Sequence, residues 1–217
     1  MSQKYPKTLH LPWSPGVSND DKRMMDVSSF LNVPLLITEK MDGSNVCLEH
    51  NIVYARSHNQ VPKHPSFDML KGMHAEFRHL IPENFQIFGE WLYAKHSIKY
   101  FDLPSYLMIF GIRDIITGEW SDWQQVEEMA TDLRVATVPV LERGLIIKSS
   151  KQLREITTQL AEHSSHYGCR EGIVVRRKYR FEDEYFPKFV GKWVRKDHVQ
   201  TDEHWSHSEI IINSLKK

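Results

Sequence analysis

Cysteine is scarce in this chain, and the apolar segments that mark secreted and membrane proteins are missing. Cys47 and Cys169 are the only cysteines among 217 residues, too few for a disulfide framework. The opening stretch MSQKYPKTLHLPWSPG is polar and broken by prolines, unlike a signal peptide. No apolar run approaches the roughly 20 residues that cross a bilayer. These absences predict a soluble protein of a reducing compartment, and we expect it in the cytoplasm and away from membranes.

Net charge is missing as well. The 28 basic side chains balance the 28 acidic ones. The chain therefore lacks the overall basic charge that is typical of nucleic-acid-binding proteins, and any such binding must come from a local patch. Hydrophobic residues make up 41% of the chain, which is enough to bury a sizeable core.

Helix and strand patterns alternate without the regular rhythm of a βαβ protein, and no repeat or linker separates them. Strands are predicted at 34–39, 86–93, 106–113, 170–177 and 186–194, and a hairpin at 45–50 and 52–56. Helices are predicted at 66–80, from Ser121 to about 133, from Ser149 or Ser150 onward, and over 207–216. Hairpins mixed with helices predict an α+β fold with largely antiparallel sheets.

Lys40 is the first residue that suggests chemistry. It comes shortly after the apolar run 34-PLLI-37 and two residues before Asp42-Gly43-Ser44, whose residue types suit a tight turn. A lysine there is either a solvated surface residue or a nucleophile at the mouth of a pocket. Burial or neighbouring cations lower a lysine pKa and make the amine reactive. Attack on a nucleotide α-phosphate also requires cations, a metal-binding carboxylate, a polar partner for the ribose and an aromatic ring for the base.

Candidates for all of these follow in short motifs, most of them on predicted strands. They are, in chain order, 40-KMDGSN-45, 55-ARS-57, 88-FGEWLY-93, 106-YLMIFGIRD-114, 171-EGIVVR-176 and 191-GKWVRK-196. One K-x-D-G is a weak signal, whereas the whole set in this order is a strong one. The set resembles the covalent nucleotidyltransferases, which comprise ATP-dependent RNA and DNA ligases and mRNA capping enzymes. Asn45 completes the RNA-ligase form of the first motif, and the stretches 93–100 and 194–205 are similar to small bacterial and phage RNA ligases.

The resemblance implies an adenylation-domain fold with a nucleotide pocket between the sheets, and it implies ATP with Mg²⁺ or Mn²⁺. It also gives roles to the residues around the first motif. Lys40 would be the nucleophile that forms a lysyl–AMP phosphoramidate. Glu39 would receive the adenine amino group, with a solvated strand-end acid as its alternative, and Asn45 would contact the nucleotide. Asp42 and Gly43 would act mainly by shaping the loop.

The middle motifs supply the expected contacts to phosphate, ribose and base. Arg56 would contact the phosphate or the ribose, because a guanidinium forks well onto oxygens, although a surface ion pair is its alternative. Glu90 lies in an apolar strand, where an acid is costly unless paired, and would accept from a ribose hydroxyl. Phe110 would stack on the purine, unless it packs in the core, and Phe88 and Tyr106 are the substitutes.

The last motifs supply the metal ligand and the remaining cations. Glu171 would hold Mg²⁺, directly or through water. Lys192 would contact the α-phosphate as pyrophosphate leaves, with Lys196 or Arg195 assisting. Lys192 and Lys196 are four apart, which puts both on one face of a strand. The predicted basic patch for RNA comprises Arg56, Arg176, Arg177, Lys178, Lys192, Arg195 and Lys196. The histidines of 198–207 lack a nearby cysteine, and solvated histidines are the preferred interpretation over a zinc site.

We expect one nucleotidyltransferase domain, 1–217, with an N-terminal arm at 1–20 and a short tail at 197–217. The stretch after Lys196 is too short for the OB-fold or helical domain of larger relatives, so a protein partner is one way to supply substrate binding. The predicted function is an ATP-dependent RNA ligase that joins 5′-phosphate and 3′-hydroxyl RNA ends through lysyl–AMP and an adenylylated 5′ end. The alternatives are a minimal DNA ligase, an adenylyltransferase for another acceptor, and a nucleic-acid-binding protein on a decayed ligase fold.

Overall fold

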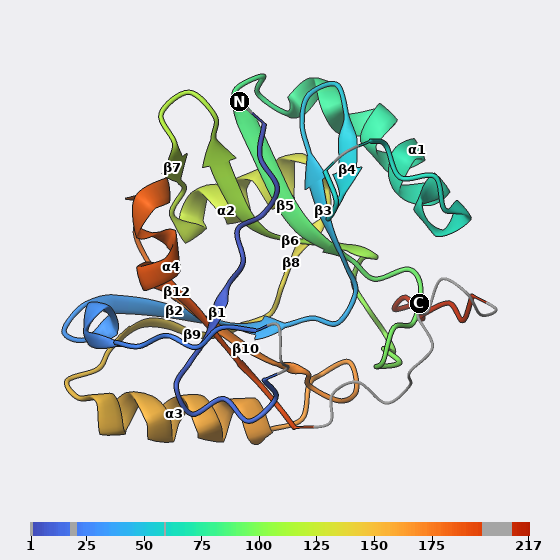
Figure 1. The fold of residues 1–217 in the computed structure, drawn as a ribbon. Helices are drawn as coiled ribbons and strands as arrows, with labels where there is room; N and C mark the ends of the chain where they lie inside the picture. The colour runs from blue at the N-terminus through green and yellow to red at the C-terminus, as the bar shows by residue number, and fades with distance from the viewer. Residues whose placement is uncertain (1, 18–20, 59, 197–209) are drawn as a thin grey trace.

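Two β-sheets pack face to face in the computed structural model, with helices on their outer sides (Figure 1). The structure describes residues 2–17, 21–58, 60–196 and 210–217. Most strand pairs are antiparallel, so the predicted α+β fold is confirmed. None of the helices in these ranges is long and apolar enough to cross a membrane.

The first sheet carries the start and the end of the predicted motif series. Its strand order is β1 (Leu9–His10), β12 (Val190–Val194), β10 (Gly172–Arg177), β2 (Pro34–Lys40) and β9 (Val140–Ile146). Only β1 and β12 pair in parallel within this sheet. Helix α3 (Ser150–Glu162) covers its outer face (Figure 1).

The second sheet carries the middle motifs. Its strand order is β11 (Phe181–Glu182), β7 (Glu119–Trp120), β6 (Leu107–Asp114), β5 (Phe85–Trp91), β3 (Ser44–Leu48) and β4 (Val53–Ala55), and β8 (Ala136–Thr137) pairs with β6 in parallel. The remaining helices are α1 (Asp68–Phe77), α2 (Trp123–Asp132), α4 (Phe186–Phe189) and the 3₁₀ turns Ser28–Phe30, Pro65–Phe67, Arg78–Leu80 and Asp183–Tyr185. Residues of α1 and α2 share one apolar core with β3, β5 and β6.

Side-chain alternation along β2 decides which residues reach the space between the sheets. Leu35 and Ile37 belong to the core that also contains Leu153 of α3, whereas Leu36 belongs to the core of the second sheet. Because successive strand side chains point to opposite faces, Lys40 shares the face of Leu36. The last residue of β2 is therefore directed between the sheets.

Two sequence-based boundaries are wrong. Strand β12 begins only at Val190, because the preceding residues form α4, which has a proline in its first turn. Helix α2 is capped by Asp122 rather than Ser121, since the Asp122 carboxylate accepts from the backbone N–H of Gln125 at 3.1 Å. The cap of α3 is confirmed: Ser149 accepts from Gln152. Strand β9 was not predicted, and its side chains are mostly half-buried without clear alternation.

The ends of the chain are partly described. The N-terminal arm is irregular, as predicted, except where β1 pairs with β12. The histidine-rich stretch 198–207 lies outside the described residues. The helix predicted over 207–216 is wrong in its described part, where Ile212 and Leu215 instead bridge to Ala94 and Leu103. These bridges attach the described end of the tail, residues 210–217, to the segment between β5 and β6.

Candidate active site

A cavity of about 720 Å³ lies between the two sheets. Residues of β2, β10 and β12 line it from the first sheet, and residues of β3, β5 and β6 line it from the second. Seven of the predicted nucleotide-contacting or catalytic residues meet here: Glu39, Lys40, Asn45, Arg56, Glu90, Phe110 and Lys192. The volume is of the size that small-ligand pockets typically have.

Lys40 and Glu171 form the central contact of this site. The Lys40 ammonium lies 2.7 and 2.6 Å from the two carboxylate oxygens of Glu171. Glu171 comes directly before β10, where Gly172 pairs with Lys40 of β2, so the sheet register itself brings the two side chains together. Burial opposes the charge on Lys40, but the carboxylates of Glu171, Glu90 and Asp42 outweigh it and raise the lysine pKa. Lys40 is therefore held as an ammonium.

Glu90 brings a further carboxylate to Lys40 from the opposite sheet. Burial raises the pKa of Glu90 to about 8, Lys40 opposes this rise, and the charges of Glu171 and Asp42 add to it. The Glu90 carboxylate also accepts from the backbone N–H of Gly43 at 3.1 Å. One lysine thus faces several carboxylates that repel one another.

The loop after Lys40 is shaped by two residues, as predicted. The Asp42 carboxylate accepts from the backbone N–H groups of Ser97 and Ile98, both at 2.8 Å. A Cβ atom on Gly43 would lie 2.6 Å from the carbonyl oxygen of Trp91, far closer than van der Waals contact. Asp42 therefore ties the loop to a neighbouring segment, and Gly43 allows the loop to lie against β5.

The predicted basic patch divides into two groups. Arg56, Arg176 and Lys192 line the cavity, whereas Arg177, Lys178, Arg195 and Lys196 do not. Lys192 lies on β12 and pairs with Asp21 at 3.3 Å, while burial lowers its pKa. The prediction that Lys196 shares one strand face with Lys192 is wrong, because β12 ends at Val194 and Lys196 lies exposed beyond it.

Phe110 is the aromatic side chain of β6 that borders the cavity, as the stacking prediction requires. Its ring is 5.1 Å from the ring of Tyr5 in an edge-to-face arrangement. The two alternative stacking residues, Phe88 and Tyr106, lie elsewhere. Phe88 is fully buried against Trp120, and Tyr106 packs against Trp91 and Tyr93, and neither lines the cavity.

A sequence model of the RNA ligase family matches residues 33–194, which includes every motif strand of both sheets. The chain belongs to the RNA ligase family. No curated protein matches the chain at a significant level.

Solved structures of RNA ligases share the fold. A variant of the Naegleria gruberi RNA ligase with ATP and Mn has a TM-score of 0.57 and 16% identity, and the match covers 91% of this chain and 59% of that one. The Naegleria gruberi RNA ligase with PPi has a TM-score of 0.55 and 18% identity, covering 88% and 57%. An archaeal ATP-dependent RNA ligase has a TM-score of 0.56 and 13% identity, covering 89% and 48%. The chain thus spans about half to three fifths of the length of these ligases.

Glu39, the residue predicted to receive the adenine amino group, also lines the cavity, and its carboxylate already has a partner. It shares the face of Leu35 and Ile37 on β2, away from Lys40. Its carboxylate lies 3.4 Å from the guanidinium of Arg170, and both side chains are almost fully buried. The structure thus pairs the Glu39 carboxylate with Arg170 beside the cavity, and its contact with an adenine amino group stays a prediction.

The N-terminal arm contributes to the site, which the sequence reasoning missed. Tyr5, Pro6, Lys7 and Thr8 line the cavity. The ring of Tyr5 also contacts those of Phe88, Phe110, Trp120 and Phe186 at centroid distances of 5.1–5.5 Å. Nothing in the polar, proline-broken arm sequence signals this position, because the contact depends on chain segments far away in the sequence.

The donors around Lys40 fit a divalent metal ion. Carboxylate oxygens are the ligands that Mg²⁺ and Mn²⁺ prefer. Burial raises the pKa of Glu171 and the nearby Asp42 charge adds to the rise, although Lys40 opposes it. A divalent cation would relieve this crowding of negative charge. Glu171, buried directly beside the Lys40 ammonium, is the ligand that the structure supports best.

Proposed function

We propose that this chain is an ATP-dependent RNA ligase that joins 5′-phosphate and 3′-hydroxyl ends. One observation carries the proposal: Lys40 reaches an inter-sheet cavity while both carboxylate oxygens of Glu171 hold its ammonium. Family membership supports it, as do the relatives whose structures are described with ATP and Mn, with PPi and as ATP-dependent.

In the first step, the neutral amine of Lys40 attacks the α-phosphorus of ATP. A nitrogen–phosphorus bond forms, the bond to the bridging oxygen of the β-phosphate breaks, and pyrophosphate leaves with the electron pair while the nitrogen loses one proton to solvent. Lys192 and Arg56 line the same cavity and supply positive charge for the phosphate oxygens. Phe110 offers its ring to the purine, and Glu90 and Asn45 offer polar atoms to the ribose. Holding the reactants in place supplies most of the rate enhancement.

The next two steps use the lysyl–AMP. An oxygen of the RNA 5′-phosphate attacks the phosphorus, the bond to Lys40 breaks, and the lysine recovers its proton. The RNA 3′-hydroxyl then attacks the 5′-phosphate, loses its proton, and displaces AMP. Arg56 is exposed at the rim of the cavity and is the first candidate for contacts with the RNA backbone.

Glu171 would hold the metal ion, Mg²⁺ or Mn²⁺, with Glu90 as the second carboxylate nearby. When bound, the ion neutralises phosphate charge and counters the carboxylates that keep Lys40 protonated. We further propose that the protein works in the cytoplasm, and that substrate binding is completed by a partner when the domain alone does not seal ends.

The test is the intact mass of the protein after incubation with ATP and Mg²⁺ or Mn²⁺. We expect the wild type to gain one AMP and Lys40→Ala to gain none. Lys151→Ala, which removes an exposed lysine of α3, is the matched control and should gain one AMP. Absence of an adduct with ATP, GTP and NAD⁺ in folded wild type would support the alternative of a binding protein on a ligase fold.

The acceptor is tested with the adduct in hand. Purified adenylylated protein is mixed with nicked duplexes, single strands and broken hairpins of RNA, and with matched DNA. Joined RNA confirms the ligase, and faster sealing of DNA supports a DNA ligase. An adduct that no nucleic acid end discharges supports an adenylyltransferase for another acceptor.

A further inference from the structure

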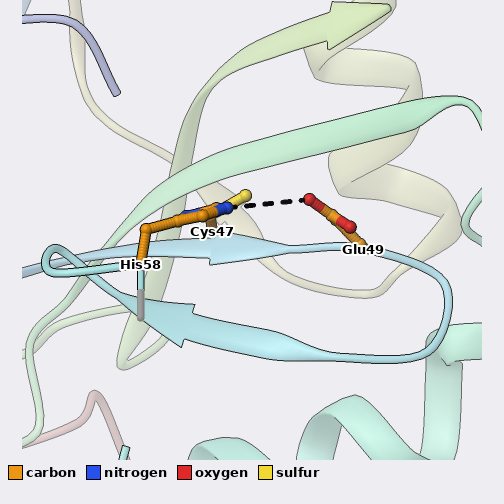
Figure 2. A group of neighbouring side chains, drawn as sticks. All are labelled: Cys47, Glu49 and His58. Atoms are coloured by element: carbon orange, nitrogen blue, oxygen red, sulfur yellow. Dashed lines mark ion pairs between the residues drawn. The ribbon is translucent and has the colours of Figure 1, made fainter. Parts of the chain in front are cut away.

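Three potential metal ligands converge on the β3–β4 hairpin, outside the residues assigned above to the reaction. Cys47 lies on β3, Glu49 directly follows that strand, and His58 follows β4. One donor atom of each side chain lies within 4.8 Å of the other two. Figure 2 shows all three side chains on the same side of the hairpin, with the imidazole directed toward the carboxylate. Thiol, imidazole and carboxylate together form the mixed donor set that Zn²⁺ accepts.

The spacing of the donors is close to that of a tetrahedral ion. Zn²⁺ holds sulfur at about 2.3 Å and nitrogen or oxygen at about 2.0–2.2 Å, which separates the ligand atoms by roughly 3.3–3.7 Å. The imidazole Nε2 of His58 lies 4.0 Å from Oε1 of Glu49. The three donors therefore need only small side-chain rotations to reach these distances.

The surroundings already orient the donors. His58 has a φ of 55°, a conformation that is uncommon outside glycine, and its ring stacks on Tyr54 with centroids 3.9 Å apart. Gln86 is fully buried and donates to the Glu49 carboxylate at 2.8 Å and to the Cys47 sulfur at 3.7 Å. Arg113 in turn donates to the Gln86 carbonyl oxygen at 3.1 Å. Such supporting hydrogen bonds are what holds metal ligands in place.

The point where these groups converge holds the hydroxyl of Ser2. That hydroxyl contacts the Glu49 carboxylate, the His58 imidazole and the Gln86 amide at once. Cys47, which is 2% exposed, accepts from Gln86, and no acceptor for its own proton is found among the described residues. An ion at this point would take the thiolate as a ligand and use the proton-free imidazole nitrogen.

We propose that Cys47, Glu49 and His58 bind one Zn²⁺ ion, which would displace the Ser2 hydroxyl from this point into the fourth ligand position. The ion would fasten the start of the N-terminal arm to the second sheet. The same arm continues into Tyr5 and Thr8, which line the cavity. The proposed site is thus structural. By fastening the arm, the bound ion would also fix the position of the arm residues that line the cavity. The proposed site does not depend on the proposed ligase activity.

The test measures zinc content and cobalt spectra on the untagged protein. After equilibration with Zn²⁺ and removal of the excess, we expect about one zinc per chain. With Co²⁺, a sulfur-to-cobalt charge-transfer band should appear in the wild type and vanish in Cys47→Ser. Cys169→Ser removes the other, exposed cysteine and should keep both zinc and band. His58→Gln keeps the thiol and should weaken Zn²⁺ binding by more than about 100-fold, beyond the 10–100-fold effect of losing a supporting residue.

Wild-type protein that retains no zinc overturns the site without any variant. A cobalt band that survives in folded Cys47→Ser, or zinc content unchanged in His58→Gln, overturns it as well. The cluster would then be a hydrogen-bonded anchor for Ser2 alone. Circular dichroism of each variant establishes that it is folded before the metal is measured.

Discussion

The ammonium of Lys40 lies 2.7 and 2.6 Å from the two carboxylate oxygens of Glu171, so the proposed nucleophile and the proposed metal ligand neutralise each other. The pair sits where β2 and β10 meet, and the Glu171 side chain is 5% exposed. In this state Lys40 cannot attack and Glu171 is not available to a cation. In the proposed reaction, substrate and metal must therefore separate the pair, which would tie nucleotide binding to activation of the lysine.

The rate of self-adenylylation should depend on pH through Lys40. Burial opposes its charge, but Glu171, Glu90 and Asp42 raise its pKa, so the neutral amine is the minor form at neutral pH. The single-turnover rate with ATP should rise about tenfold per pH unit below that pKa. Higher metal concentration should move the profile to lower pH, because the ion counters the carboxylates. A rate that is flat between pH 6 and about 9 would contradict this account of Lys40.

Glu90 should make the protein less stable as the pH rises. Burial raises its pKa from 4.5 to about 8, so the unfolded chain ionises first. The stability that comes from the neutral carboxyl is full below pH 4.5 and is lost as the pH rises through about 8. In Glu90→Gln, the free energy of unfolding should fall less between these limits than in the wild type. Urea denaturation across the pH range measures the difference, and parallel curves would contradict it.

Gly43 and Gly72 form a matched pair for substitution. A Cβ on Gly43 would meet the Trp91 carbonyl oxygen at 2.6 Å, whereas a Cβ on Gly72 would meet nothing within 4 Å. Gly43→Ala should lower the free energy of unfolding by about 1–3 kcal/mol and slow adenylylation, because the loop after Lys40 must move. Gly72→Ala should stabilise α1 by about 0.5–1 kcal/mol and leave the rate unchanged. Equal stability of the two variants would contradict the close packing of Gly43.

Arg170 and Glu39 should behave as a coupled buried pair. Their side chains are 5% and 0% exposed, so Arg170→Met leaves a carboxylate buried without its partner. We expect a loss of about 3–5 kcal/mol in unfolding free energy, and recovery of most of it when Glu39→Leu is added. If the double variant also forms the AMP adduct with an unchanged KM for ATP, the Glu39 carboxylate is not the adenine ligand. Additive losses would contradict the pairing.

The sequence predicted the motif-bearing strands and most of the cavity because both rest on local signals. The apolar run before Lys40 and the turn residues Asp42 and Gly43 locate the end of β2 without any knowledge of the fold. The resemblance carried by the ordered motifs then predicted that Glu90 and Lys192 line the same nucleotide site. The partner of Glu39 could not be predicted, since Arg170 lies 131 residues further along the chain.

The contribution of the arm was hidden for the same reason. Tyr5 enters the site through rings that come from β5, β6, β7 and α4, and its own neighbours in the sequence are polar or proline. Strand ends are likewise set by tertiary contacts rather than by local pattern. Strand β12 ends at Val194, as predicted, so Lys196 of the last motif lies beyond the strand and outside the cavity lining.

We expect Lys192 and Lys196 to differ in function although they occupy the same motif. Lys192 lines the cavity and burial lowers its pKa, whereas Lys196 lies exposed beyond β12. Lys192→Ala should slow adenylylation by about 10²–10³-fold. This is the effect expected when one preorganised group that stabilises the developing negative charge is lost. Lys196→Ala should keep the wild-type rate. Single-turnover measurement of the AMP adduct, with unfolding curves to show that both variants fold, separates the two. A larger effect at Lys196 would contradict the role of Lys192 in the reaction and would mean that Lys192 serves mainly to hold Asp21, its partner at 3.3 Å.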